Sequence, residues 1–120
     1  MDERQRLALE EADDGVWVGC NVAGRREGSW SYYKNCALLK TVRYAEGVKQ
    51  GRGYAFDEAG HLLLALEFEG DRIHGQVRFF SRSGEHLATY KYIYDKLDRV
   101  EHYLLHEESP PKHKTFVPEF

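Results

Sequence analysis

The sequence predicts a mainly β fold, an elongated and twisted antiparallel sheet of tandem β-hairpins with a short N-terminal helix. Aromatic and β-branched residues alternate along most of the chain, as they do in half-buried strands. Polar segments that end in glycine separate these runs, and the whole pattern recurs about every 24 residues. At 120 residues and 42% hydrophobic content, the chain is long enough for one modest core. We therefore expect a single domain over residues 1–120.

The helix is expected over residues 2–12. Leu7 lies there among arginine, glutamine and glutamate, a composition with fair helix propensity but only a thin apolar face. Acidic residues and Gly15 then interrupt the pattern, and Val16, Trp17 and Val18 introduce β-forming residues. The strands are therefore predicted to begin at about Val16.

The repeats are expected over residues 16–105, as about three hairpin units. When Cys36, Gly60 and Gly84 are aligned, an aromatic residue follows each of them eight positions later, at Tyr44, Phe68 and Tyr92. This aromatic stripe is predicted to lie in the core. Because Cys36 replaces a glycine and its turn is one residue shorter, a different turn type is expected there.

The C-terminal part of the chain is expected to close the sheet and then leave it. Val100 to Leu105 is predicted as the closing strand. Residues 106–120 are predicted to be an extended tail, because Pro110 and Pro111 cannot donate ladder hydrogen bonds. Phe116, Val117 and Phe120 are the apolar residues expected to tie this tail back to the sheet.

One segment carries a family resemblance. It reads Gly28-Ser29-Trp30-Ser31-Tyr32-Tyr33-Lys34-Asn35-Cys36-Ala37-Leu38 and is followed by Tyr44 and Gly47. This motif resembles the variant MORN repeat of the YwqK-type antitoxin family, and residues 28 to about 94 are covered by it and two looser copies. The resemblance implies an elongated antiparallel sheet that contacts other proteins, often as an antitoxin or immunity protein encoded beside a toxin.

Charge and cysteine content exclude several classes of partner. The net charge of −3 lacks the basic excess needed to bind nucleic acid or an anionic membrane. Cys20 and Cys36 fit neither a zinc site nor a disulfide framework. No apolar run approaches the roughly 20 residues of a membrane span, and the N-terminus lacks a signal-peptide pattern. A cytoplasmic location is therefore expected.

No catalytic or metal-binding pattern stands out. His102 and His106 have the spacing of two ligands on a helix, but on a strand they would lie about 13 Å apart. Neither cysteine has a base placed beside it by the sequence. The acidic residues near Asp57 and Glu67 are more typical of a solvated face than of a glycosidase pair or a metal site. We expect no enzymatic activity, no cofactor and no metal.

Two functions from different classes follow. The leading hypothesis is an antitoxin or immunity protein that occludes the active surface of a cognate bacterial toxin. The alternative is a MORN-like scaffold or adaptor that binds proteins without inhibiting them, and an enzyme with an unrecognised site ranks a distant third. The sequence leaves open whether exposed edge strands pair two copies into a homodimer.

Strand alternation predicts where a partner would bind. One face is expected to bury the set Leu62, Leu64, Leu66 and Phe68, and the opposite face to become acidic towards the end of this strand. The expected partner-binding residues are Tyr33, Glu67, Glu69, Asp71 and Phe80. The acidic residues would meet the basic cleft of a nuclease or similar enzyme, and the two aromatic residues would anchor the contact. The alternative is that Glu67 and Glu69 only keep the face soluble.

Overall fold

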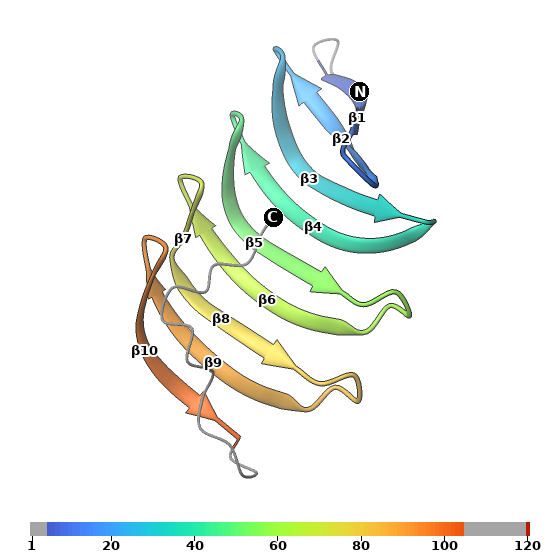
Figure 1. Cartoon of the computed structure of the whole chain (residues 1–120). Helices are drawn as coiled ribbons and strands as arrows, with labels where there is room; N and C mark the ends of the chain where they lie inside the picture. Colours follow the sequence, from blue (N-terminus) through green and yellow to red (C-terminus); the bar gives the residue numbers. More distant parts are fainter. Residues whose placement is uncertain (1–4, 105–119) are drawn as a thin grey trace.

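The computed structural model describes residues 5–104 and 120, and in this part of the chain it contains strands and turns but no helix. Ten strands form one open antiparallel sheet in the order β1-β2-β3-β4-β5-β6-β8-β9-β10, with β7 paired to β6 (Figure 1). The molecule measures 54 × 30 × 24 Å along its principal axes. The strands are β1 Gln5–Glu11, β2 Val16–Val22, β3 Arg25–Lys34, β4 Ala37–Ala45, β5 Val48–Phe56, β6 Leu62–Glu69, β7 Arg72–Ile73, β8 Gly75–Phe80, β9 His86–Ile93 and β10 Lys96–Tyr103.

The predicted N-terminal helix is wrong over residues 5–11, where the chain forms strand β1. All seven residues of β1 pair in register with β2. This ladder satisfies the backbone through a neighbouring strand and places Ala8 against the core. Tertiary pairing thus outweighs a helix propensity that offered only a thin apolar face. Residues 2–4 lie outside the described part of the chain.

The C-terminal expectations have a mixed outcome. The closing strand exists, but β10 begins at Lys96 instead of Val100. The predicted tail over 106–120 lies outside the described residues except for Phe120, whose ring packs edge-on against Phe68 at 5.7 Å between centroids. Phe116 and Val117 also lie outside them. In the described ranges no helix is long and apolar enough to cross a membrane.

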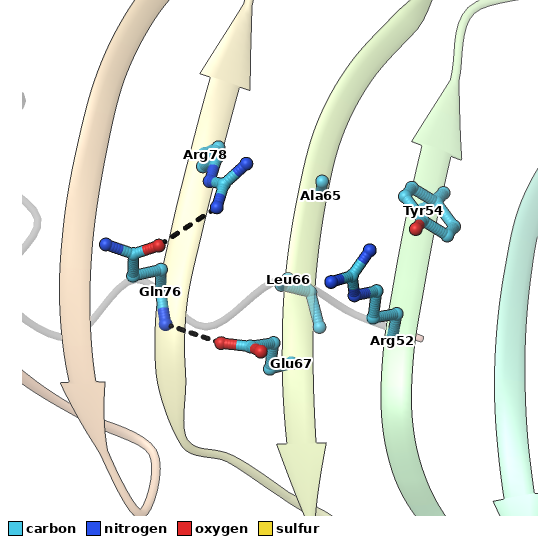
Figure 2. Close-up of a pocket in the computed structure, with 7 residues that line it drawn as sticks. All are labelled: Arg52, Tyr54, Ala65, Leu66, Glu67, Gln76 and Arg78. Carbon is cyan, nitrogen blue, oxygen red and sulfur yellow. Dashed lines mark hydrogen bonds between the residues drawn. The ribbon is translucent and has the colours of Figure 1, made fainter.

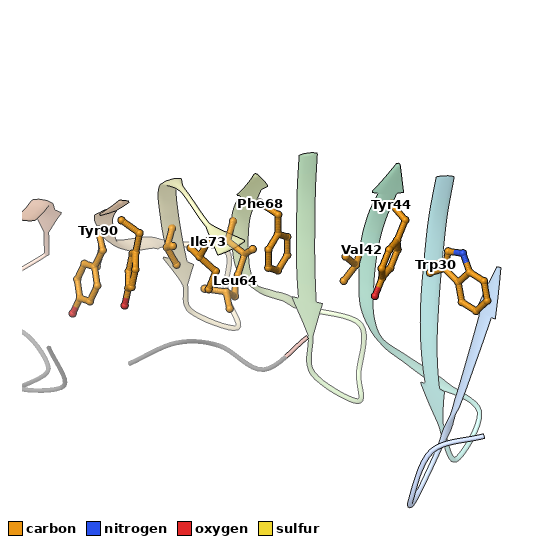
Figure 3. Close-up of a cluster of buried hydrophobic side chains, with 11 residues drawn as sticks. Trp30, Val42, Tyr44, Leu64, Phe68, Ile73 and Tyr90 are labelled. Carbon is orange, nitrogen blue, oxygen red and sulfur yellow. The ribbon is translucent and has the colours of Figure 1, made fainter. Parts of the chain in front are cut away.

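The core lies on one face of the sheet, which we call the core face. Its side chains project from the same side of consecutive strands (Figure 3). The predicted stripe of Tyr44, Phe68 and Tyr92 is buried, with 7%, 5% and 0% of each residue exposed. The remaining buried members are Trp30, Val42, Leu64, Leu66, Ile73, Val77, Ala88 and Tyr90. Each large side chain buried in this way contributes about 1.5–3 kcal/mol.

Trp30 forms the centre of the N-terminal part of the core. Its ring lies over Gly19 of β2, where an added Cβ would come within 2.3 Å of a ring carbon. The indole Nε1 donates a hydrogen bond to the carbonyl of Cys20 at 3.1 Å. On the ring's face lies the guanidinium of Arg26, 4.2 Å from the centroid. Gly19 is therefore required by close approach, since any side chain would collide with the ring.

Two kinds of turn join the strands. The turn at Asn35-Cys36 has two residues with φ of 51° and 65°, the geometry of a type I′ hairpin turn. The later turns over 57–61 and 81–85 are longer and use Gly60 and Gly84 at positive φ. The different turn type predicted at Cys36 is confirmed.

β-Bulges change which face some residues share. Opposite β5, Ala55 pairs with Leu64 and Phe56 with Leu62, so that Leu63 is an extra residue. Since Ala55 packs on the core and Phe56 is its neighbour, Leu62 lies on the opposite face from Leu64. The predicted buried set is therefore right for Leu64, Leu66 and Phe68 and wrong for Leu62, because strict alternation does not account for a bulge.

Replacing Gly19 with alanine is expected to lower the free energy of unfolding by about 1–3 kcal/mol, because the new Cβ collides with the Trp30 ring. Urea denaturation followed by tryptophan fluorescence measures this. Ser31→Ala, on the opposite face of β3, is the control and should change stability by less than about 0.5 kcal/mol. Equal stability of the two variants would contradict the close contact.

Replacing Cys36 with glycine is expected to stabilise the protein by about 0.5–1 kcal/mol, because glycine adopts positive φ without the cost that an L-residue bears there. Cys36→Ser retains that cost and should leave the unfolding free energy unchanged. Thermal unfolding of both variants distinguishes backbone strain from loss of the thiol. A gain that is equal for glycine and serine would rule out the strain.

Candidate protein-interaction surface

We call the face opposite the core the open face. Along each strand, residues that point to the open face alternate with residues that point to the core face, except at the bulges. Cross-strand partners share a face, and one such row runs through Thr41, Tyr54, Ala65, Arg78 and Thr89 from β4 to β9. Three zones cross the strands of this face. They are an apolar zone near the turns at 35–36, 57–61 and 81–85, a basic zone in the middle, and an acidic edge near the turns at 46–47, 70–71 and 94–95.

The apolar zone consists of three cross-strand pairs. These are Tyr33 with Leu38, Phe56 with Leu62, and Phe80 with His86. Tyr33 is 37% exposed, whereas Phe56 and Phe80 are half-buried. The pairs come from successive hairpins, so an aromatic ring stands on every second strand along the sheet.

A loop over 57–61 borders the apolar zone. Asp57 organises it: Oδ1 accepts hydrogen bonds from the N–H of Ala59 at 3.0 Å and of His61 at 2.9 Å. The second oxygen, Oδ2, contacts Nδ1 of His61 at 2.9 Å and Nε of Arg82 in the next loop at 3.2 Å. Between the two loops lies a cleft of about 420 Å³ whose apolar lining residues are Leu39, Phe56 and Ala59.

The hydrogen bonds at Asp57 also affect its protonation. The hydrogen bond from the backbone N–H of His61 lowers the pKa of the Asp57 carboxyl group. The imidazole ring of His61 and the backbone N–H of Ala59 lower this pKa as well. Because the folded-state pKa lies below the unfolded-state pKa, the carboxylate contributes stability above the unfolded-state value. That contribution is lost as pH falls through the folded-state pKa.

The basic zone is visible around a small hollow of about 80 Å³ (Figure 2). Arg52 of β5 lies directly opposite Glu67 of β6. The guanidinium of Arg78 on β8 donates a hydrogen bond to Oε1 of Gln76 at 3.1 Å. A hydrogen bond with Tyr54 raises the pKa of Arg52, which keeps it charged. The zone also contains Arg43, Lys91 and Arg99.

The acidic edge carries Glu69 and Asp71. Asp71 Oδ1 accepts a hydrogen bond from the N–H of Lys49 at 2.8 Å, and the N–H of Asp71 donates to the Lys49 carbonyl at 3.0 Å. Glu67 also binds the backbone, because its Oε2 accepts a hydrogen bond from the N–H of Gln76 at 3.1 Å. Glu69 has a side chain 53% exposed and lies 3.7 Å from Nε2 of His74. Of the three acidic residues, Glu67 and Asp71 thus have structural roles as well.

The five predicted site residues do not form one cluster. Tyr33 and Phe80 lie in the apolar zone, and the seven steps from Leu62 to Glu69 place the acidic edge about 23 Å away, at about 3.3 Å per residue. Glu67 lies beside the basic zone. The sequence did not single out the arginines of this zone. The signal for them is spacing: Arg52 and Tyr54, like Gln76 and Arg78, stand two positions apart on a strand and therefore share a face.

The core face has a second cleft, of about 440 Å³, near its N-terminal end. Arg26, Lys40 and Lys49 contribute cations to it, and Phe120 borders it. Burial acts to lower the pKa of Arg26, but its hydrogen bonds to Glu10 and to the Tyr44 hydroxyl raise it overall. Burial lowers the pKa of Lys49, whose Nζ donates to the Phe120 carbonyl. Arg26 thus binds residues of β1 and β4, and Lys49 binds Phe120, which assigns these two cations a structural role.

The histidines and cysteines of the described residues form no metal-binding cluster. Across residues 5–104 and 120, no three His, Cys, Asp or Glu side chains come together as a metal-binding group. His102 stacks on His86 at 4.6 Å between centroids, and His106 lies outside the described residues. Cys20 is half-buried and Cys36 exposed, and both are free thiols.

Comparisons of the chain with protein-family models, with curated proteins and with solved structures found no match.

Asp57→Asn is expected to lower the melting temperature at neutral pH, because the amide cannot replace the carboxylate towards His61 and Arg82. The deficit should shrink as pH falls through the folded-state pKa of Asp57, where the wild type also loses its carboxylate. Thermal unfolding from acidic to neutral pH measures this. Glu58→Gln, an exposed position in the same loop, should leave the profile unchanged. A deficit independent of pH would contradict this role of the Asp57 charge.

Proposed function

We propose that this protein is an immunity protein or antitoxin, which neutralises a cognate bacterial toxin by covering its active surface with the open face. The observation that carries the proposal is the composition of this face. Aromatic residues of the apolar zone lie beside a row of arginines, and aromatic residues and arginine are the residue types enriched where binding energy concentrates. The resemblance of the motif at residues 28–38 to the YwqK-type family supports the same function.

We infer in addition that the sheet consists of MORN-like repeats. Three bulges each contain one extra residue, and in every case it is a leucine. These are Leu39, Leu63 and Leu87, which stand 24 positions apart. The turn residues Asp71 and Asp95, also 24 positions apart, each accept a backbone N–H on an earlier strand through Oδ1. A repeated unit presents similar side chains at regular intervals, which suits a long protein surface.

The toxin would be oriented by charge. In this proposal Tyr33 and Phe80 are the apolar anchors, and the acidic edge at Glu69 and Asp71 faces basic residues of the toxin, such as those of a nuclease cleft. The basic zone around Arg52 then meets carboxylates nearer the centre of the contact. A scaffold or adaptor would use the same face without inhibiting its partner, so only an assay of inhibition separates the two functions.

Co-expression with the protein encoded beside this chain tests the proposal. The neighbouring product alone should arrest growth, and this chain should restore it. Tyr33→Ala with Phe80→Ala should weaken protection and raise the Kd of the purified complex by at least about tenfold, the cost of removing two anchors.

Val100→Ala is the matched control, because Val100 is comparably exposed, 39% against 37%, and pairs with the core residue Tyr90, away from the open face. It should protect as the wild type does, and circular dichroism checks that each variant folds. A stable complex without growth protection would favour the adaptor. Full protection by the folded double variant would move the interface away from the apolar zone.

A further inference from the structure

The two edge strands of the sheet, β1 and β10, differ in how well their unpaired sides are protected against pairing with another chain. β10 carries two register shifts and the charged residues Lys96, Asp98, Arg99 and Glu101. Bulges and charges are the usual devices that prevent an edge strand from pairing with another chain. β1 has neither an inserted residue in its ladder nor a proline, and it pairs with β2 over seven consecutive residues. Its charged residues, Arg6, Glu10 and Glu11, flank an uncharged centre of Leu7, Ala8 and Leu9. Figure 1 shows it at the opposite end of the sheet from β10.

β1 also exposes apolar side chains. Leu7 and Leu9 are 69% and 68% exposed, the largest values among the exposed large hydrophobic residues of the described chain. They stand opposite Cys20 and Val18 of β2 on the open face, whereas Ala8 packs on the core. The rim of the open face therefore carries an apolar patch of its own, at Leu7 and Leu9, which no neighbouring strand covers on its outer side.

The order of residues in β1 is complementary to itself when two copies run antiparallel about Ala8. Residues whose numbers sum to 16 then face each other, so Leu7 lies opposite Leu9 and Arg6 opposite Glu10 of the second copy. A two-fold axis through Ala8 repeats both contacts, giving two leucine pairs and two ion pairs. The carboxylate of Glu10 already binds Arg26 through Oε1, but a carboxylate has about four acceptor sites and accommodates both cations.

Other pairings of β1 with itself lose this complementarity. An antiparallel pairing centred on Leu9 places Glu10 opposite Ala8 and Glu11 opposite Leu7, without an ion pair. A parallel pairing in register places Glu10 opposite Glu10 and Arg6 opposite Arg6, where like charges repel. Of these arrangements, only the one centred on Ala8 satisfies the leucines and the charges together.

We propose that β1 is the interface of a homodimer, in which two copies pair antiparallel about Ala8 and join their sheets into one. The apolar, basic and acidic zones begin at β3 and are left uncovered by this interface. A dimer would therefore present two partner surfaces. This assembly is independent of the toxin and of the proposed function.

Sedimentation velocity of the full chain over a range of concentrations tests the dimer, which has twice the 14.0 kDa mass of one chain. Leu7→Lys with Leu9→Lys should be monomeric, since lysine on an edge opposes pairing. Val100→Lys on β10, at a residue 39% exposed, is the matched control and should remain dimeric. A wild-type chain that stays monomeric up to high micromolar concentration would overturn the proposal, as would a dimeric double-lysine variant.

Charge exchange tests the register. Arg6→Glu and Glu10→Lys each create two like-charge contacts in their own homodimer and should weaken it by about tenfold or more. When the two variants are mixed, position 6 of each chain faces an opposite charge at position 10 of the other, so heterodimers should form. Folded variants that fail to associate on mixing would exclude pairing about Ala8. If Glu10→Lys does not fold, Arg6→Glu alone decides: unchanged association would exclude this register.

Discussion

Aromatic rings that lie over glycines at or beside the neighbouring strand hold the core face together. Trp30 lies over Gly19, and Tyr32 and Phe68 lie in the same way over Gly15 and Gly53. Within the described residues, the only group outside the sheet and its turns that packs on this face is Phe120. Within these residues the sheet therefore buries most of its core face with its own side chains. An aromatic ring that packs on a glycine of the neighbouring strand shields the backbone of that strand from solvent. A smaller side chain is too short to do so.

This arrangement leaves the open face as the surface on which we propose that a partner binds. Along a strand the residues of the two faces alternate, so each large core residue has neighbours that point away from the core. The core-face positions are constrained by contacts with rings, whereas Arg52, Tyr54 and Arg78 contact cross-strand partners and polar neighbours of their own strands on the open face. Surface substitutions away from such contacts usually change stability by less than about 0.5 kcal/mol.

The turns divide the open face into zones of different chemistry. Two-residue turns with positive φ, such as Gly70-Asp71, bring carboxylates to one side of the sheet, where Asp71 also binds the backbone of Lys49. The loops on the other side are organised by Asp57 and follow strands that end in aromatic residues, among them Phe56. Charge and apolar surface are thereby separated along the strands.

The sequence by itself determined the mainly β, antiparallel class of fold, the buried stripe that includes Phe68, and the unusual turn at Cys36. It also placed the beginning of one strand at Val16, although another strand, β1, precedes it. These features depend on local chemistry: alternation, turn residues and periodicity act within a few positions of the chain. It also predicted Tyr33 and Phe80 as aromatic residues that leave the core, and the structure places both on the open face.

Tertiary structure alone decided the remaining features. Residues 5–11 became a strand because β2 was available to pair with them, and Leu62 left the core face because a bulge at Leu63 reversed the alternation. The basic zone formed because register brought Arg52 and Arg78 onto adjacent rows, although they come from different hairpins of the chain. Register depends on the hydrophobic patterns of both strands and on the geometry of the turn that joins them, so one strand alone does not specify it.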